Sequence, residues 1–284
     1  MMKPGTLGLV LVAVLAGCAP RGAVQVFPEA AEVGTVRELF VASARAPDEV
    51  GPGFSSAPAA GLGFAAFAVA VPPERVPGTV SFPPTRGAPD PRTDFLTVST
   101  TSFADSTAFV REVNAAVAAL PPGRRDAFVF VHGFNTNFAE GLYRHAQMSH
   151  DFRTPGISVS FTWPSAARVT AYGTDREATL VARDRLQELL GLLAKSKAER
   201  IIVMGHSMGA MVVMEAMRQT AMVNDRSILE STDAIVLMAP DLDIGVFRAQ
   251  MQPIAARGVD VIVFTSSGDR ALRASARLRG DTVR

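Results

Sequence analysis

The run Gly205-His206-Ser207-Met208-Gly209 is the part of the sequence whose residue types and spacing most clearly allow chemistry. Its pattern, G-x-S-x-G, lies between an apolar stretch and an amphipathic one, a context in which it marks a nucleophile elbow. The tight turn strains the serine backbone, and the two glycines leave room where a Cβ would clash. We therefore predict Ser207 as a nucleophile. A tight strand-to-helix turn without chemistry is the alternative.

A second backbone donor is expected in the loop after an earlier apolar run, which reads His132-Gly133-Phe134-Asn135. Gly133 would let this loop approach a reacting carbonyl group. The N–H of Phe134 would then pair with that of Met208 around a developing oxyanion. His132 is predicted to be a packed, hydrogen-bonded loop residue and not a catalytic one. Chemistry of this kind implies no metal and no cofactor.

An acid that orients a catalytic base should follow the serine in the chain, and the sequence offers it in two places. Asp269 comes after the second apolar run beyond Ser207, whereas Asp241 and Asp243 come after the first. We prefer Asp269, because the acid usually follows the second strand after the elbow. Asp241 and Asp243 are the alternatives, and these two aspartates could instead cap a helix or a loop.

The base is harder to place, because every histidine of the chain precedes Ser207. His206 is adjacent to the serine, but its side chain should point away from the nucleophile. His145 and His150 are predicted on the solvated face of a helix. Because His132 is assigned a structural role as well, none of the four histidines is an evident base for Ser207.

Alternating helices and buried apolar runs surround these residues and predict an α/β fold with a doubly wound, mostly parallel sheet. Three strands should come first, and the proline-rich segment 72–93 should be a surface loop. Strands are expected over 36–42, 62–71, 95–99, 127–131, 157–161, 201–204, 234–238 and 259–264. Helices are expected to end at Leu120 and to cover 138–151, 174–193, 209–222 and 271–278.

Two helix starts carry local signals. Ser102 with Asp105 predicts a capping box for the helix that ends before Pro121. Thr174 with Glu177 predicts the start of a later helix. The apolar residues that this later helix should bury on one face are Val181, Leu186, Leu189 and Leu193.

The N-terminus predicts a lipoprotein signal peptide over residues 1–17. Lys3 is followed by an apolar run and then by the lipobox Leu15-Ala16-Gly17-Cys18. The apolar run is too short to span a bilayer, since a helix needs about twenty residues for that. We predict cleavage before Cys18 and acylation of this cysteine, which attaches the protein to a membrane. An ordinary cleaved signal with an incidental cysteine is the alternative.

The rest of the chain is predicted to be a tether over 18–35 and one domain over 36–284. Cys18 is the only cysteine, so no disulfide is expected and the domain depends on its hydrophobic core. The N-terminus resembles that of a bacterial lipoprotein precursor, and in such proteins an aspartate after the cysteine favours the inner membrane. Ala19 stands at that position, so the resemblance implies the outer membrane of a bacterial envelope. The 28 basic and 27 acidic residues nearly cancel without forming a basic stripe, which argues against nucleic acid as a partner.

The motifs together give the sequence a family resemblance. The runs 129–137, 161–165 and 172–177 and the elbow resemble the α/β-hydrolase family once known as DUF900, which comprises esterase-like bacterial proteins. The similarity extends from about Val36 to the end and includes parts of the proline-rich loop. It implies an α/β-hydrolase fold and a serine hydrolase that cleaves a carboxylic ester or related acyl bond in a small substrate.

The resemblance also bears on the acid and the base. It places the family's S-x-x-D-x-A-L segment at Ser266–Leu272, which favours Asp269 as the acid. The family's histidine lies on a loop after a final strand, and this chain ends at Arg284 without either. We therefore expect a hydrolase shortened at its C-terminus, with almost no turnover. The alternative is a naturally inactive relative, an envelope lipoprotein that uses the fold for binding.

Overall fold

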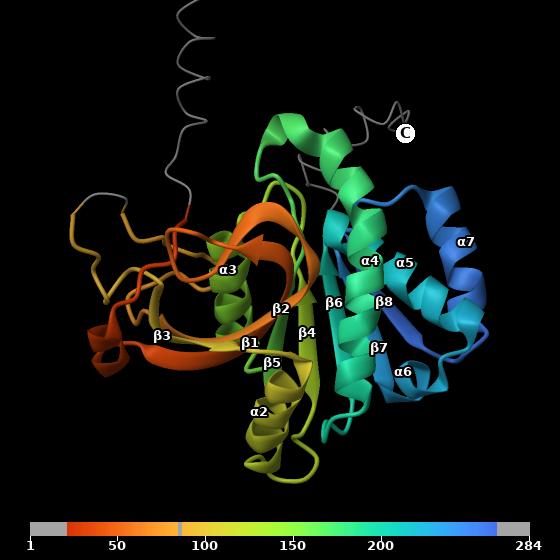
Figure 1. Ribbon diagram of the computed structural model, residues 1–284, viewed down its shortest axis with the longest axis horizontal. Coiled ribbons are helices and arrows are strands. Elements are labelled where there is room, and N and C mark those ends of the chain that lie inside the picture. Colours follow the sequence, from red (N-terminus) through yellow and green to blue (C-terminus); the bar gives the residue numbers. More distant parts are fainter. Residues whose placement is uncertain (1–21, 85–86, 266–284) are drawn as a thin grey trace, which may run out of the picture.

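The computed structural model describes residues 22–84 and 87–265 of the chain. In this part, eight strands form one sheet in the order β3-β2-β1-β5-β4-β6-β7-β8. The pairs β3–β2 and β2–β1 are antiparallel, and every other neighbouring pair is parallel (Figure 1). The doubly wound, mostly parallel α/β fold that begins with three strands is thus confirmed, and the antiparallel pairing of those three strands is a finding of the structure.

Every expected strand is present. The strands are β1 (Thr35–Pro47), β2 (Phe54–Val71), β3 (Leu96–Phe103), β4 (Ala127–Val131), β5 (Ile157–Thr162), β6 (Ile201–His206), β7 (Thr232–Met238) and β8 (Asp260–Phe264). The helices are η1 (Pro28–Glu32), α2 (Ser106–Ala118), α3 (Phe138–Asp151), η2 (Val169–Ala171), α4 (Tyr172–Ala194), α5 (Met208–Val223), α6 (Arg226–Ser231) and α7 (Ile244–Ala255). β8 is one edge of the described sheet, and the helix expected over 271–278 lies outside the described residues.

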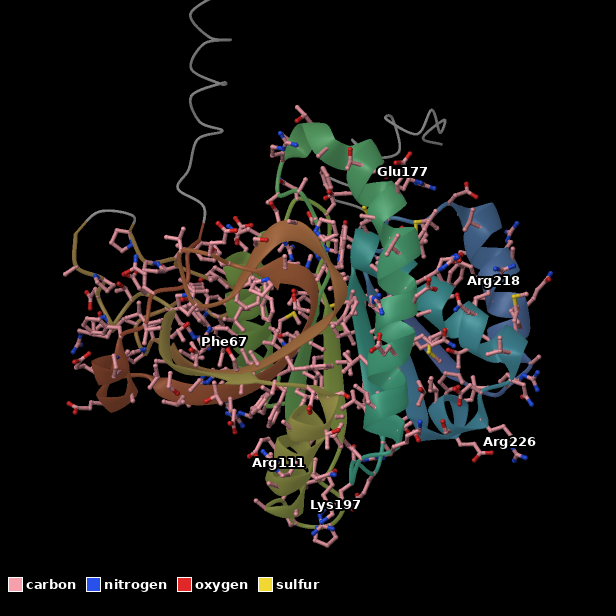
Figure 2. The ribbon with its side chains drawn as sticks, viewed as in Figure 1. Phe67, Arg111, Glu177, Lys197, Arg218 and Arg226 are labelled. Atoms are coloured by element: carbon pink, nitrogen blue, oxygen red, sulfur yellow. The ribbon has the colours of Figure 1, made fainter. Side chains whose placement is uncertain are left out.

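The two faces of the sheet carry separate cores. One core packs α2, α4, α5 and α7 against alternate residues of β4 to β7. On the other face α3 packs against β1 and β2, where Phe67 belongs to the buried set. Figure 2 shows Phe67 within the curl of the N-terminal strands, whereas Arg111, Lys197 and Arg226 lie at the periphery.

Both predicted helix starts are wrong. Ser102 pairs with Ala65 in the β3–β2 ladder, so Asp105 alone caps α2 by accepting from the Ala108 N–H. α4 continues directly from η2 and begins at Tyr172 without a side-chain cap. Its buried stripe passes through Ala182, and consequently the neighbouring Val181 is 65% exposed.

Residues 22–34, which the sequence analysis assigns to a tether, pack on the domain. Val26 forms a bridge to Thr97, and Ala30 is buried against Ala70 and Leu96. The Gly22 carbonyl accepts a hydrogen bond of 2.9 Å from the Asn137 side chain. The chain is therefore attached to the domain from residue 22 onward. None of the described helices is both long and apolar enough to cross a membrane.

Candidate active site

The predicted elbow is a sharp turn between β6 and α5. Ser207 has φ 53° and ψ −121°, a backbone conformation that L-residues rarely adopt. Its N–H donates to the Met238 carbonyl at 3.0 Å. Its own carbonyl accepts from the N–H groups of Ala210 (3.0 Å) and Asp241 (3.1 Å). The end of β7 and the first turn of α5 thus hold the strained serine in place.

Three glycines permit this packing. A Cβ at Gly205 would lie 2.7 Å from the Cα of Ala210, and one at Gly209 would collide with the carbonyl oxygens of the β4 end. A Cβ at Gly133 would lie 2.9 Å from the Cβ of Ser207. Since real Cβ atoms do not approach so closely, β6, α5 and the loop after β4 can meet at Ser207 only with glycine at these positions.

Two backbone donors border the serine. Within residues 22–84 and 87–265, the N–H groups of Phe134 and Met208 donate to no other group. Met208 opens α5, whose N-terminal end carries a partial positive charge. Phe134 follows Gly133, at which an added Cβ would lie 2.9 Å from the Ser207 Cβ. The arrangement can therefore stabilise negative charge that develops on an oxygen beside Ser207.

His132 is buried inside the loop after β4, which we call the HG loop (residues 132–137). Its Nδ1 donates to the Gly133 carbonyl at 2.9 Å, and its Nε2 accepts from Arg45 and from the Trp163 N–H. The ring stacks on the Trp163 indole. Burial, with the Arg45 charge next in weight, lowers the pKa of His132 to about 3. His132 is consequently neutral at pH 7, and its ring nitrogens are engaged away from the nucleophile.

Arg45 is a functional candidate that the sequence analysis missed. The side chain is 1% exposed and donates to the carbonyls of Thr136 (2.8 Å) and Ser165 (3.2 Å) besides contacting His132. Burial lowers the pKa of Arg45 to about 10, while the carboxylates of Asp175 and Glu140 act in the opposite direction. The guanidinium therefore stays charged at pH 7 and fixes both ends of the HG loop. Its partners His132 and Ser165 lie far along the chain, so no local sequence signal marks Arg45.

Asp175 is the buried carboxylate that accompanies Arg45. It accepts from the Ser165 hydroxyl at 2.6 Å and from the Ala166 N–H at 2.8 Å. A longer contact of 3.4 Å joins it to the N–H of Asn135, which has φ 55°. Asp175 lies in the segment 172–177 of the family resemblance, but sequence reasoning used only its neighbours, as helix-start signals.

The prediction of a solvated face for His145 and His150 is wrong. His145 is fully buried between Phe128 and Phe130, and its Nδ1 lies 2.6 Å from the Ser160 hydroxyl. Burial lowers its pKa to about 3. His150 is half-buried, and burial lowers its pKa as well. The reason is that α3 is covered on one side by the sheet and on another by the proline-rich loop.

His206 is exposed, and its ring lies beside the same glycine as the Ser207 side chain. A Cβ at Gly133 would meet the His206 Nδ1 at 3.0 Å as well as the Ser207 Cβ. The His206 ring and the serine side chain therefore border the same glycine. Ser207 Oγ itself makes no hydrogen bond to any group in the described ranges.

The candidate acids occupy different places. Asp241 is buried, accepts from the Tyr172 hydroxyl at 2.8 Å, and through its N–H contacts the Ser207 carbonyl. The Tyr172 ring also packs edge-on against Phe134, so it connects the two loops. Asp243 caps α7 by accepting from the Val246 N–H. Asp269 lies outside the described residues.

A cavity of about 780 Å³ borders the serine turn. Gly133, His206 and Met238 line its end next to Ser207, and the HG loop, β4, α3 and the proline-rich loop line the rest. Over the described part of the chain, no three His, Cys, Asp or Glu side chains gather as metal ligands would. The site therefore consists of a strained serine, two backbone donors and an adjoining cavity.

Among three comparisons with known proteins, the match to a family model bears on the fold. A search of curated proteins finds no match. An acylaminoacyl peptidase from Pyrococcus horikoshii is 13% identical over 57% of this chain and 35% of its own, with a TM-score of 0.28. A family model described as "Alpha/beta hydrolase of unknown function (DUF900)" matches residues 110–284, whereas we expected similarity from Val36. The chain thus belongs to the DUF900 family of α/β hydrolases.

Proposed function

We propose that the protein is a serine hydrolase that cleaves a carboxylic ester or a related acyl bond. Ser207 is the nucleophile, and the N–H groups of Phe134 and Met208 form the oxyanion hole. The observation that carries this proposal is the strained backbone of Ser207, held beside two unused backbone donors. Strain of this kind costs about 1–3 kcal/mol and persists mainly at functional sites.

In the proposed reaction the Ser207 oxygen attacks the carbonyl carbon, and its proton passes to a base. The carbonyl oxygen becomes an oxyanion, which the two N–H groups stabilise. Collapse of this intermediate transfers the proton to the leaving alcohol and leaves an acyl-serine, which water then hydrolyses. Asp269 remains our preferred orienting acid.

Of the four histidines, three are held elsewhere. The Nε2 of His132 is hydrogen-bonded to Arg45, and His145 is packed between Phe128 and Phe130. His150 lies near the C-terminal end of α3. His206 borders Ser207 and is the histidine to test. Without a positioned base, the loss in kcat is about 10⁶ in the subtilisin triad, and binding and the oxyanion hole leave a residual ~10³–10⁴ over water.

A fluorophosphonate probe tests the nucleophile. We expect slow labelling at Ser207 in the purified protein and none in Ser207→Ala, with mass spectrometry to locate the adduct. Folded protein that stays unlabelled would instead favour the non-catalytic envelope lipoprotein. With p-nitrophenyl esters, turnover should stay below about 1 s⁻¹. Faster turnover that is lost in His206→Gln would identify His206 as the base.

We also propose that the protein is anchored to the bacterial envelope, preferably the outer membrane, through acylated Cys18. The lipobox supports this, although residues 1–21 lie outside the described structure. Cys18→Ala should leave the membrane fraction or accumulate as an unprocessed precursor. A processed Cys18→Ala protein that still fractionated with membranes would contradict the anchor.

A further inference from the structure

We infer that the cavity beside Ser207 is a groove for a long apolar acyl chain, so the substrates are acyl lipids and not short esters. This rests on the proposed function, because it supplies the acyl group that Ser207 attacks. It goes further by assigning a substrate class, acyl lipids, and by naming α3 as the helix that selects the length of the acyl chain.

One face of α3 gives the groove its length. Residues at helical spacing line it from Glu140 and Gly141, beside the HG loop, to Asp151 and Phe152 at the other end of α3. At 1.5 Å per residue this distance is about 18 Å. An extended dodecanoyl chain fits within that length.

The inner wall of the groove is apolar. Phe130 from β4 and Met238 from β7 lie on the sheet side, and Met148 comes from α3. Phe82 faces them from the proline-rich loop, and Phe152 stands at the far end with 56% of its surface exposed. A ligand that follows this wall gains free energy by removing apolar surface from water.

The polar side chains at the rim are already paired. Asp151 forms an ion pair with Arg75 and accepts from the Gln147 amide and from the Gly78 N–H. Arg144 donates to the Gly78 carbonyl at 2.9 Å. These contacts fasten the proline-rich loop across the outer side of α3. Because the rim groups satisfy one another, what the groove offers to a ligand is mainly its apolar wall.

The N-terminal segment brings this groove close to the expected lipid anchor. Gly22 packs against Phe82, since an added Cβ would lie 2.5 Å from that ring, and its carbonyl is bound by Asn137 of the HG loop. Cys18 precedes Gly22 by four residues, which span at most about 14 Å when fully extended. A lipid on Cys18 would hold the groove within reach of acyl chains in the same bilayer.

The first experiment measures chain-length selectivity. For p-nitrophenyl esters from acetate to dodecanoate, we expect kcat/KM to rise roughly fourfold per methylene, which corresponds to about 0.8 kcal/mol. Phe152→Asp should lower kcat/KM for the dodecanoate about tenfold or more and leave the acetate unchanged. Val223→Asp is the matched control, because Val223 is an exposed apolar residue at the C-terminal end of α5.

Binding separates failure of the groove from failure of the proposed chemistry. Calorimetry with dodecanoate and the folded Ser207→Ala protein requires no turnover. We expect saturable binding that Phe152→Asp weakens and Val223→Asp does not. Binding without any Ser207-dependent hydrolysis would support the acyl-chain groove and refute the proposed esterase activity. Hydrolysis with no dodecanoate binding and no chain-length preference would refute the acyl-chain groove.

Discussion

The two loops that meet at Ser207 are held in place by different physical means. The elbow depends on backbone: glycines at close approaches, a strained serine, and hydrogen bonds from the ends of β7 and α5. The HG loop depends on buried side chains, with Arg45 and Asp175 bonded to its carbonyl and N–H groups. Added side-chain volume should therefore disrupt the elbow, whereas the loss of a buried charge should disrupt the HG loop.

The largest effect is expected when the charge of Arg45 is removed. Arg45→Met leaves the carbonyls of Thr136 and Ser165 without the Arg45 donor and removes the charge that faces Asp175, which should destabilise the fold by about 3–5 kcal/mol. Urea unfolding measures this change. Arg111→Met, in an exposed pair with Glu112, should change stability by less than about 0.5 kcal/mol. Equal losses in both variants would show that the buried guanidinium has no special role.

A methyl group in the elbow should come next. Gly209→Ala would push a Cβ against the carbonyls of Val131 and His132, and since backbone cannot yield, we expect about 3 kcal/mol of destabilisation and loss of probe labelling. Gly173→Ala is the matched control, because Gly173 is also the second residue of its helix and has open space around it. It should stabilise the protein by about 0.5–1 kcal/mol. Retained labelling in Gly209→Ala would refute the steric account of the elbow.

Acid should destabilise the fold through two buried histidines, His132 in the HG loop and His145 on α3. His132 and His145 have folded pKa values of about 3, below the ordinary 6.5, so the unfolded chain binds more protons between these values. Stability is then complete above pH 6.5 and falls as pH decreases toward 3, by about 2 kcal/mol per histidine between pH 7 and 5.

The matching variant is His145→Gln, which should remove about half of this pH dependence and keep Ser207 reactive, because His145 lies away from the HG loop. Urea titrations at several pH values, with probe labelling at pH 7, measure both properties. An unchanged slope in His145→Gln would mean that this buried ring is not the titrating group.

The smallest effect is expected at Asp175. Two donors, the Ser165 hydroxyl and the Ala166 N–H, now bind the Asp175 carboxylate. Asp175→Asn keeps the shape of the side chain but replaces one accepting oxygen with an NH₂ group. We expect a loss of about 1–2 kcal/mol and weaker labelling, measured by urea unfolding and probe kinetics. Asp184→Asn, an exposed position on the same helix, should leave both unchanged. If the two variants behaved alike, Asp175 would not position the HG loop.

The same contrast explains what the sequence could reveal. The elbow, the HG dipeptide and the strands have signals within a few residues, so they could be predicted. Arg45 meets partners 87 and 120 positions later in the chain, and no local pattern indicates such contacts. His145 and His150 were misplaced because polar residues on α3 resemble a solvated face, although the sheet and a loop enclose that helix.

The hydrogen bonds of the Ser207 backbone have a consequence for local opening. Because its N–H is bonded to Met238 and its carbonyl to the N–H of Asp241, the serine turn can open only together with the end of β7. The amide protons of Ser207 and Asp241 should therefore exchange with solvent at similar, slow rates, as members of one cooperative unit. The geometry of Ser207 thus depends on the end of β7. Partial opening of β7 would abolish the reactivity of Ser207 before the rest of the domain unfolds.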